Sequence, residues 1–417
     1  MGQALETIEW YTNGMFFGAF TAKPLKTPSI IFDIGGTSVG GAFVLLSPGE
    51  KPLIAHAARE WLRPMEEVSM ERLLGLLEGA MGAVADNLLS IGRKRIFAAG
   101  YYGDLPSTVH CFLTAPWCAS RADTIRISGA RPFKVTDALL ERAIKREKKA
   151  IVDQIGATDA TKKGKAPLAI MESRVLSLSV NGYETAAVHG QSAEDIEFSL
   201  YTALAEQAVL DRFSARAARS FGIDSAEHHS FLFAFLSAVR GFKEAHEDFL
   251  LLDVSGEVTE ISVVRGSRLL TSASYPLGRN FLIRTIREKC GVSPEEALSI
   301  IALHAGRQGN DAFSLRFTPA LAHLEAQWMR GFENALTRLV GEAFLPHTVF
   351  IAADSAIAPW VAAALEKEAL YQYTLAAKPF VANLADEKML DAYVAFGPGV
   401  EKDPFLSLDA LCLTTLL

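Results

Sequence analysis

Cysteine is scarce in this chain of 417 residues. The four cysteines, Cys111, Cys118, Cys290 and Cys412, have neither the spacing of a metal-binding motif nor that of a disulfide framework. Such use of cysteine is typical of reduced thiols in the cytoplasm. The first residues also lack the basic segment with which a signal peptide begins. We therefore expect a cytoplasmic protein.

The chain also has fewer basic than acidic residues and lacks long apolar runs. The 41 Lys and Arg residues are outnumbered by 48 Asp and Glu residues, for a net charge of −7. This balance argues against a nucleic-acid partner. No apolar run reaches the roughly 18 residues that span a bilayer, so we expect no autonomous membrane insertion. Half of the residues are nevertheless hydrophobic, which at this length predicts two or more domains with large cores.

The most informative stretch is 29–46, which predicts a strand, a tight turn and a returning strand. Asp33 ends the first strand, and the turn that follows contains Gly35, Gly36, Thr37 and Ser38. Glycines let a backbone approach a ligand closely, and an acid beside exposed N–H groups can hold a metal-bound phosphate. An ordinary hairpin could have the same residues. The stretch is not a Walker loop, because no Gly-Lys-Ser/Thr follows.

A second stretch, 249–270, repeats this pattern. An apolar strand ends in Asp253, a turn of small residues contains Ser255 and Gly256, and Thr259 and Glu260 open the next strand. Two strand–Asp–turn–strand units in one chain predict two similar half-molecules that face one ligand. In this respect the sequence resembles the actin-like ATPase superfamily, in which the two turns are the phosphate-1 and phosphate-2 loops.

The region between the two loops narrows the resemblance. It predicts a charged helix at 135–149, a strand at 169–180, a hairpin turn at Asn181 and Gly182, and a strand at 195–202. A small α+β unit in this place is similar to the inserted subdomain of the FtsA/PilM type. The expected fold class is α/β: an actin-like two-lobed fold of duplicated ribonuclease-H-like halves with an FtsA/PilM-type inserted α+β subdomain.

The resemblance covers roughly residues 28–417 and implies a division into domains. The expected parts are an N-terminal extension (1–27), the first lobe with the phosphate-1 loop (28–115), the inserted subdomain (116–204), the rest of the first lobe (205–245), the second lobe with the phosphate-2 and adenosine motifs (246–380), and a return to the first lobe with the C-terminal helix (381–417).

Two local expectations concern the first lobe. Residues 95–100 predict a short buried strand that follows the helix of residues 65–91. His228 and His229 are expected on a helix, where adjacent residues do not share a face, so we predict no metal site there.

The resemblance implies that ATP and Mg²⁺ bind between the lobes. Asp33 and Asp253 would approach the metal, and Asp253 and Glu260 are the candidate catalytic acids. Glu260 would orient water or point outward on its strand, and both alternatives stay open. The residues implied around the nucleotide are Gly35, Gly36, Thr37, Ser38, Ser255, Gly256, Thr259, Gly278 in the turn into the second lobe, and Ala352, Ala353 and Asp354 at the adenosine motif.

The sequence departs from the family pattern at three places. Glu257 stands where a small residue is expected, and its charge would repel a γ-phosphate unless a cation intervenes. Arg279 replaces a glycine, and the adenosine motif lacks its glycines. Two interpretations follow: a protein that binds ATP weakly and is at most a weak ATPase, or a scaffold that has lost the site.

The function that the resemblance implies is that of a PilM-like protein of a type IV pilus or secretion platform. It would dock a short segment of a membrane-anchored partner, and so be peripheral at the inner membrane, with self-association into filaments as a further implication. The C-terminal stretch 404–417 has no Lys or Arg for anionic lipid and predicts a buried helix.

Two alternatives remain from the sequence. One is an FtsA-like cell-division protein that tethers a tubulin-like filament. The other is a sugar or metabolite kinase of the same superfamily, for which Asp104 would be the candidate catalytic acid.

Overall fold

The computed structural model describes most of the chain. The described residues are 26–63, 69–106, 108–159, 167–185, 190–224, 226–242, 245, 248–266, 268–305, 311–340 and 344–416. Nearly all of the predicted N-terminal extension lies outside these ranges.

The first of three sheets has six strands in the order β15-β3-β2-β1-β4-β9. Strands β1, β2 and β3 are antiparallel neighbours, whereas β4 runs parallel to β1 and β9 parallel to β4. The strands are β1 (Thr27–Ile34), β2 (Ser38–Leu46), β3 (Leu53–Trp61), β4 (Val109–Leu113), β9 (Ala226–Ser230) and β15 (Ala395–Phe396).

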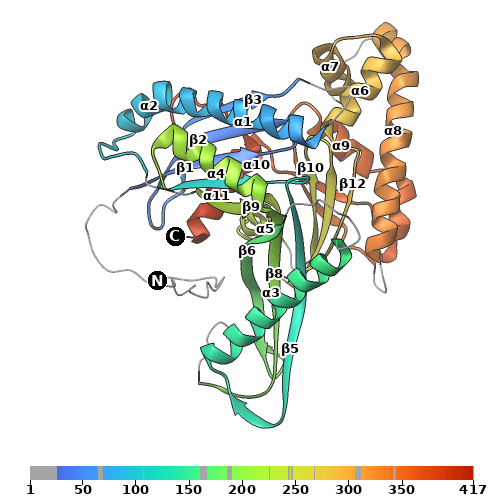
Figure 1. Cartoon of the computed structure of the whole chain (residues 1–417). Coiled ribbons are helices and arrows are strands. Elements are labelled where there is room, and N and C mark those ends of the chain that lie inside the picture. The colour runs from blue at the N-terminus through green and yellow to red at the C-terminus, as the bar shows by residue number, and fades with distance from the viewer. Residues whose placement is uncertain are drawn as a thin grey trace.

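The second sheet repeats this topology. Its order is β12-β11-β10-β13-β14, with β10, β11 and β12 antiparallel and β13 and β14 parallel to β10. Asp33 and Asp253 therefore occupy the same place in both sheets, one residue before the ends of β1 and β10. Figure 1 shows these two strands in their sheets. The strands are β10 (Phe249–Val254), β11 (Thr259–Arg265), β12 (Arg268–Tyr275), β13 (Thr348–Ala353) and β14 (Val381–Leu384).

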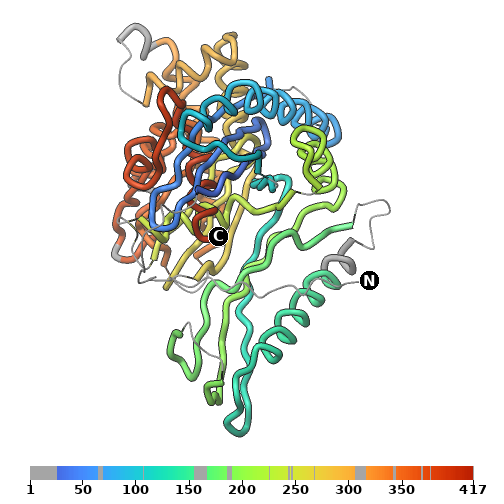
Figure 2. The backbone as a smooth tube through the Cα atoms, turned by 90° about the vertical axis from the view of Figure 1, so that its left-hand side faces the viewer, coloured from blue at the N-terminus to red at the C-terminus, as the bar shows by residue number. Residues whose placement is uncertain are grey.

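A third sheet projects away from the other two and is accompanied by helix α3 (Asp137–Asp159), as Figure 2 shows. Its order is β5-β8-β6-β7. The hairpin turn is confirmed: Asn181 and Gly182 both have positive φ, of 51° and 82°. The strands are β5 (Cys118–Lys134), β6 (Leu168–Val180), β7 (Tyr183–Glu184) and β8 (Ser192–Glu206).

Helices cover the outer faces of the two large sheets and fill the space between them (Figure 1). The helices of the first lobe are α1 (Met70–Asn87), η1 (Leu88–Gly92), α2 (Arg93–Ala98), α4 (Gln207–Phe221) and α5 (Phe231–Arg240). Those that follow are α6 (Arg279–Cys290), α7 (Pro294–Ala305), α8 (Asp311–Val340), α9 (Ala358–Leu365), η2 (Glu368–Tyr373), η3 (Leu375–Ala377), α10 (Glu387–Leu390) and α11 (Pro404–Leu416).

Helices α5 and α11 join the two lobes through one apolar core. This core includes Phe231 and Phe235 of α5, Leu406 of α11, Ile31 of β1 and Phe350 of β13. The C-terminal helix is buried, as its apolar sequence without Lys or Arg predicts. Because both sheets pack on the same helices, parting the lobes exposes apolar surface, which costs free energy.

One helical stretch among the described residues, Met70–Ala98, is long and apolar enough to cross a membrane by length and composition alone. In the fold its α1 part packs on the first sheet, where Leu73, Leu77 and Val84 are buried. This is the behaviour of an amphipathic core helix.

Two local predictions were wrong. Residues 95–100 do not form a strand, because α2 continues the helical run through Ala98, and the strand beside β1 is β4. His228 and His229 lie on strand β9 rather than on a helix, so they point to opposite faces of the sheet. The predicted domain boundaries stay predictions.

Candidate functional site

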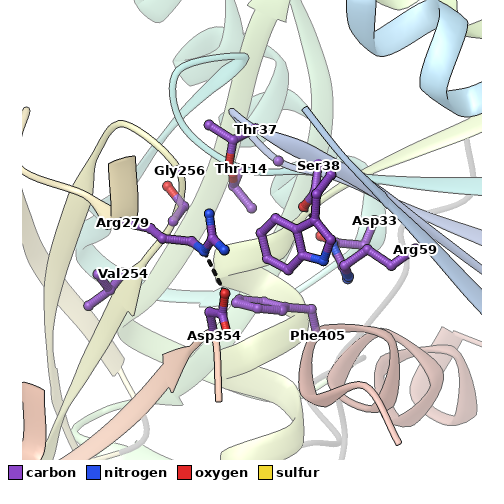
Figure 3. Close-up of a pocket in the computed structure, with 13 residues that line it drawn as sticks. Asp33, Thr37, Ser38, Arg59, Thr114, Val254, Gly256, Arg279, Asp354 and Phe405 are labelled. Carbon is purple, nitrogen blue, oxygen red and sulfur yellow. Dashed lines mark hydrogen bonds and ion pairs between the residues drawn. The ribbon is translucent and has the colours of Figure 1, made fainter. Parts of the chain in front are cut away.

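A small pocket lies where the two Asp-containing turns meet (Figure 3). It leaves a volume of about 20 Å³, room for one or two water molecules. Its lining comes from both lobes and from α11: Asp33, Gly35, Thr37, Ser38, Arg59, Trp61, Thr114, Val254, Ser255, Gly256, Arg279, Asp354 and Phe405.

Arg59 of β3 fills the side of the pocket beside the first turn. Its guanidinium donates to Asp33 Oδ2 at 2.7 Å and to Ser38 Oγ at 2.8 Å. It also binds both carboxylate oxygens of Asp403, just before α11, in a bidentate pair. Gly40, opposite Arg59 on β2, makes room, since a Cβ there would lie 2.6 Å from Arg59 Nη2. The cation beside Asp33 is thus a side chain.

The charges in this cluster are buried and depend on one another. Burial raises the pKa of Asp33, an effect that the positive charge of Arg59 opposes. Burial alone would lower the pKa of Arg59, but Asp403 and Asp33 raise it above its usual value. Burial, reinforced by Asp33, also raises the pKa of Asp409 on α11 well above its usual range. Arg59 therefore stays charged, whereas its buried surroundings favour the protonated form of Asp409.

A second arginine closes the other side of the pocket. Arg279, at the start of α6, forms an ion pair with Asp354 at the end of β13. The Arg279 guanidinium also lies 4.2 Å from the ring centroid of Trp61 on β3, a cation–π contact between elements of different lobes. Asp354, predicted as part of the adenosine motif, is therefore held by a protein cation.

The two turns touch each other directly. A Cβ built on Gly256 would lie 2.4 Å from Thr37 Cγ2, so the Thr37 side chain rests on the second turn. The N–H groups of Arg279 and Asn280 donate to the Ser255 and Gly256 carbonyls at 2.9 and 2.8 Å. The free N–H groups at the start of α6 are thereby used by the second turn itself.

Polar side chains of the second turn also bond within the protein. Ser255 Oγ donates to the Val258 carbonyl, and Thr259 Oγ1 donates to the Leu277 carbonyl. Glu257 points toward α6, where its carboxylate accepts two hydrogen bonds from Arg284 and one from Asn280. Arg284 is thus the cation that must intervene if Glu257 is not to repel a γ-phosphate.

Asp253 and Glu260 form an acidic pair below the second turn. They are direct partners across β10 and β11 and so share a face of the sheet. Burial raises the pKa of Asp253 well above its usual range, and the nearby Glu260 and Asp33 add to this effect. Burial raises the pKa of Glu260 to about 7. Glu260 is half-buried on its strand, and the two alternatives for its role stay open.

The structure brings together about half of the predicted site. Seven predicted residues line the pocket: Asp33, Gly35, Thr37, Ser38, Ser255, Gly256 and Asp354. The predicted residues outside the lining are Gly36, Asp253, Thr259, Glu260, Gly278, Ala352 and Ala353. Sequence reasoning missed Arg59, Trp61, Thr114, Val254 and Phe405. The pairing of Arg59 on β3 with Gly40 on β2 appears only once the two strands are aligned.

In this arrangement the pocket is smaller than a triphosphate with Mg²⁺. Asp33 and Asp253 each keep one buried oxygen, Oδ1, without a hydrogen-bond partner in the described part of the chain, and such atoms suit a hydrated metal. However, the other Asp33 oxygen is ion-paired to Arg59, and Thr37 occupies the space next to Gly256. A triphosphate cannot enter the remaining volume unless the turns separate.

Two sheets that share the same order over five strands, with an Asp near the end of the central strand of each, define the actin-like two-lobed fold. Comparison with known structures confirms this class. The chain is similar to a solved structure of a PilM–PilN type IV pilus biogenesis complex, with a TM-score of 0.56 and 15% identity over 93% of this chain and 98% of that chain. The fold is therefore actin-like and PilM-like.

Two further solved structures are more distant. The ethanolamine utilization protein EutJ from Carboxydothermus hydrogenoformans has a TM-score of 0.39 and 9% identity, over 93% of this chain and 89% of that chain. A Bacteroides thetaiotaomicron protein with an actin-like ATPase fold has a TM-score of 0.35 and 8% identity, over 93% and 95%. No family model and no curated protein sequence matches the chain.

Replacing Arg59 tests the buried ion-pair cluster. Arg59→Ala leaves the carboxylates of Asp33 and Asp403 buried without their cation, so we expect the free energy of unfolding to fall by about 3–5 kcal/mol. Urea denaturation followed by circular dichroism measures this loss. The matched control is Arg212→Ala, which breaks a more exposed pair with Glu78 and should cost less than about 1 kcal/mol. Similar losses in both variants would contradict the role given to Arg59.

The pKa of Glu260 makes stability depend on pH. Since its folded pKa of about 7 exceeds its ordinary 4.5, the folded state binds the proton more tightly, and this group destabilises the protein as the pH rises from 4.5 to above 7. Glu260→Gln imitates the protonated side chain. Between pH 5 and 8, wild type should lose about 2 kcal/mol more stability than the variant, a value reduced for partial exposure. Urea denaturation at both pH values measures this difference, with Glu50→Gln at the surface as control. An unchanged pH profile in Glu260→Gln would refute the assignment.

Proposed function

We propose that this chain is a PilM-like assembly protein, a cytoplasmic scaffold that holds a short segment of a membrane-anchored partner in a pilus or secretion platform. The observation that carries the proposal is the extent of the structural similarity. It includes 98% of a chain from a PilM–PilN complex, and 93% of this chain, and so extends over the inserted sheet as well as both lobes.

The inserted sheet offers a surface for such a segment. Strand β5 has 17 residues and lies at an edge of the sheet, and most of its residues from Ser128 to Lys134 are exposed. An edge strand presents backbone N–H and C=O groups that can pair with an added strand. Extended peptides commonly bind in this way, with main-chain hydrogen bonds for affinity and side-chain pockets for specificity.

Nucleotide has a secondary place in this proposal. ATP and Mg²⁺, which the family resemblance implies, would require Arg59 to leave Asp33 and Thr37 to leave Gly256. Both changes oppose the ion pairs and the shared core of α5 and α11. The free energy needed to open the lobes offsets part of the free energy of ATP binding, so the observed affinity for ATP is weaker. We therefore propose a scaffold that holds its partner in the closed state, with ATP as a weak ligand.

Calorimetry with ATP in magnesium buffer tests the nucleotide part. We expect a dissociation constant of about 1 mM or weaker for wild type, because the pocket must open before the triphosphate enters. Asp33→Ala, measured alongside, should give the same weak signal. Micromolar binding by wild type that is lost in Asp33→Ala would show that an open pocket with a functional Asp33 dominates in solution.

Site-specific photo-crosslinking in cells tests the partner. A photoreactive amino acid at Thr124, exposed on β5, should crosslink one protein that carries a membrane-spanning segment, identified by mass spectrometry. The control position is Leu375, which is 68% exposed on the second lobe and should give no such product. A synthetic peptide of the partner's cytoplasmic segment should then bind the purified protein equally with and without ATP.

Three outcomes would count against the proposal. Equal products from Thr124 and Leu375 would show that the inserted sheet is not the docking surface. A tubulin-like filament protein as the product would favour the cell-division alternative. No binding of the identified peptide by the purified protein would show that the crosslink reports proximity alone.

A further inference from the structure

Two histidines and a glutamate from neighbouring strands meet at the edge of the first sheet. His110 lies on β4, and Glu227 and His229 lie on β9, the last strand of the sheet. In the parallel register His110 is the partner of Glu227, and Phe112 is the partner of His229. Since side chains alternate along a strand, His110, Glu227 and His229 all project from the same face.

The spacing of their ligand atoms is that of a tetrahedral metal site. His110 Nδ1 lies 3.2 Å from His229 Nε2 and 3.4 Å from Glu227 Oε2, and the remaining side of the triangle is 3.8 Å. Ligands at zinc's usual bond lengths and tetrahedral angles are about 3.3 Å apart. One ion could therefore contact all three atoms after shifts of a few tenths of an ångström. It is the one group of this kind in the described residues.

A buried carboxylate orients one of the histidines. Glu172 of β6 lies with Oε1 3.4 Å from His229 Nδ1, and its Oε2 accepts the Ser230 N–H at 3.0 Å. An ionised carboxylate only accepts hydrogen bonds, so the His229 proton belongs on Nδ1 and the lone pair of Nε2 faces the triangle. A carboxylate behind a ligating histidine is the usual outer partner in zinc sites.

Charge and access are also compatible with a cation. The positive charge of Arg174 is nearby, with Nε 3.5 Å from Glu172 Oε1. The two carboxylates of Glu172 and Glu227 offset the charge of Arg174 and part of the charge of a bound metal ion. His110 and His229 are only 5% and 4% exposed, whereas the Glu227 side chain is 58% exposed. The site is therefore preorganised within the protein and open on one side, where a water molecule or another ligand could complete the tetrahedron.

We propose that His110, Glu227 and His229 bind one divalent transition-metal ion of the zinc class, with Glu172 as a positioning residue. His and carboxylate ligands in tetrahedral geometry suit Zn²⁺ and its spectroscopic substitute Co²⁺. The ion ties β4 to the edge strand β9 and, through Glu172, to β6 of the inserted sheet. The site is separate from the pocket between the lobes and independent of the proposed partner.

Titration with Co²⁺ alone tests this site. Chelator-treated, untagged protein should bind one equivalent of Co²⁺ and develop the intense visible absorption of a tetrahedral complex, which Zn²⁺ then abolishes. His110→Gln and His229→Gln should each lose this absorption. Glu172→Gln should keep the band but weaken Co²⁺ affinity roughly 10–100-fold, the usual effect of an outer carboxylate.

The neighbouring His228 provides the matched control. It lies on the opposite face of β9, where its Nε2 is 3.4 Å from Ser214 Oγ, so His228→Gln should leave the Co²⁺ spectrum unchanged. Circular dichroism of every variant shows whether loss of the band reflects unfolding. Two results would overturn the proposal: no tetrahedral absorption in folded wild type, which would leave His110 and His229 as a simple hydrogen-bonded pair, or an unchanged spectrum in folded His229→Gln.

Discussion

The guanidinium of Arg59 is the contact on which the pocket side of the first lobe depends. It joins the end of β1 through Asp33, the start of β2 through Ser38 and the start of α11 through Asp403. A buried cation is costly to desolvate unless several acceptors surround it, and here two carboxylates and a hydroxyl do so. The same contacts place a positive charge beside Asp33, the residue predicted from the sequence to approach a metal. Stability of the first lobe and access to the pocket are thus governed by one side chain.

Much of the fold could be predicted because its signals are local. Each of the two turns can be predicted from about twenty consecutive residues, which contain an apolar strand, an acid at its end and small residues after it. The hairpin at Asn181 and Gly182 requires left-handed backbone, which these two residues accept readily. Strand β4 was missed because Val109–Leu113 is a short apolar run without alternation, and a short run does not distinguish helix from strand.

The candidate site could be predicted only in part, because its decisive contacts are long-range. Arg59 and Asp403 are 344 residues apart, and no local pattern pairs them. The position of Glu257 in the second turn predicted that its carboxylate faces the pocket. The carboxylate instead points toward α6, where Arg284 binds it. His110 and His229 show what the pairing of strands adds. Once β4 is paired with β9, these two residues from distant segments project from the same face of the first sheet.

The late position of Asp403 in the chain has a consequence for biosynthesis. Strand β15 and helix α11 complete the first lobe. Strands β1 to β3 therefore leave the ribosome long before β15 and α11, the C-terminal elements that pack on them. At roughly 5–20 residues per second, the delay between Arg59 and Asp403 is on the order of tens of seconds. The second sheet, whose strands all lie between Phe249 and Leu384, can form earlier. The first lobe is thus completed last, although five of its six strands precede the second sheet in the chain.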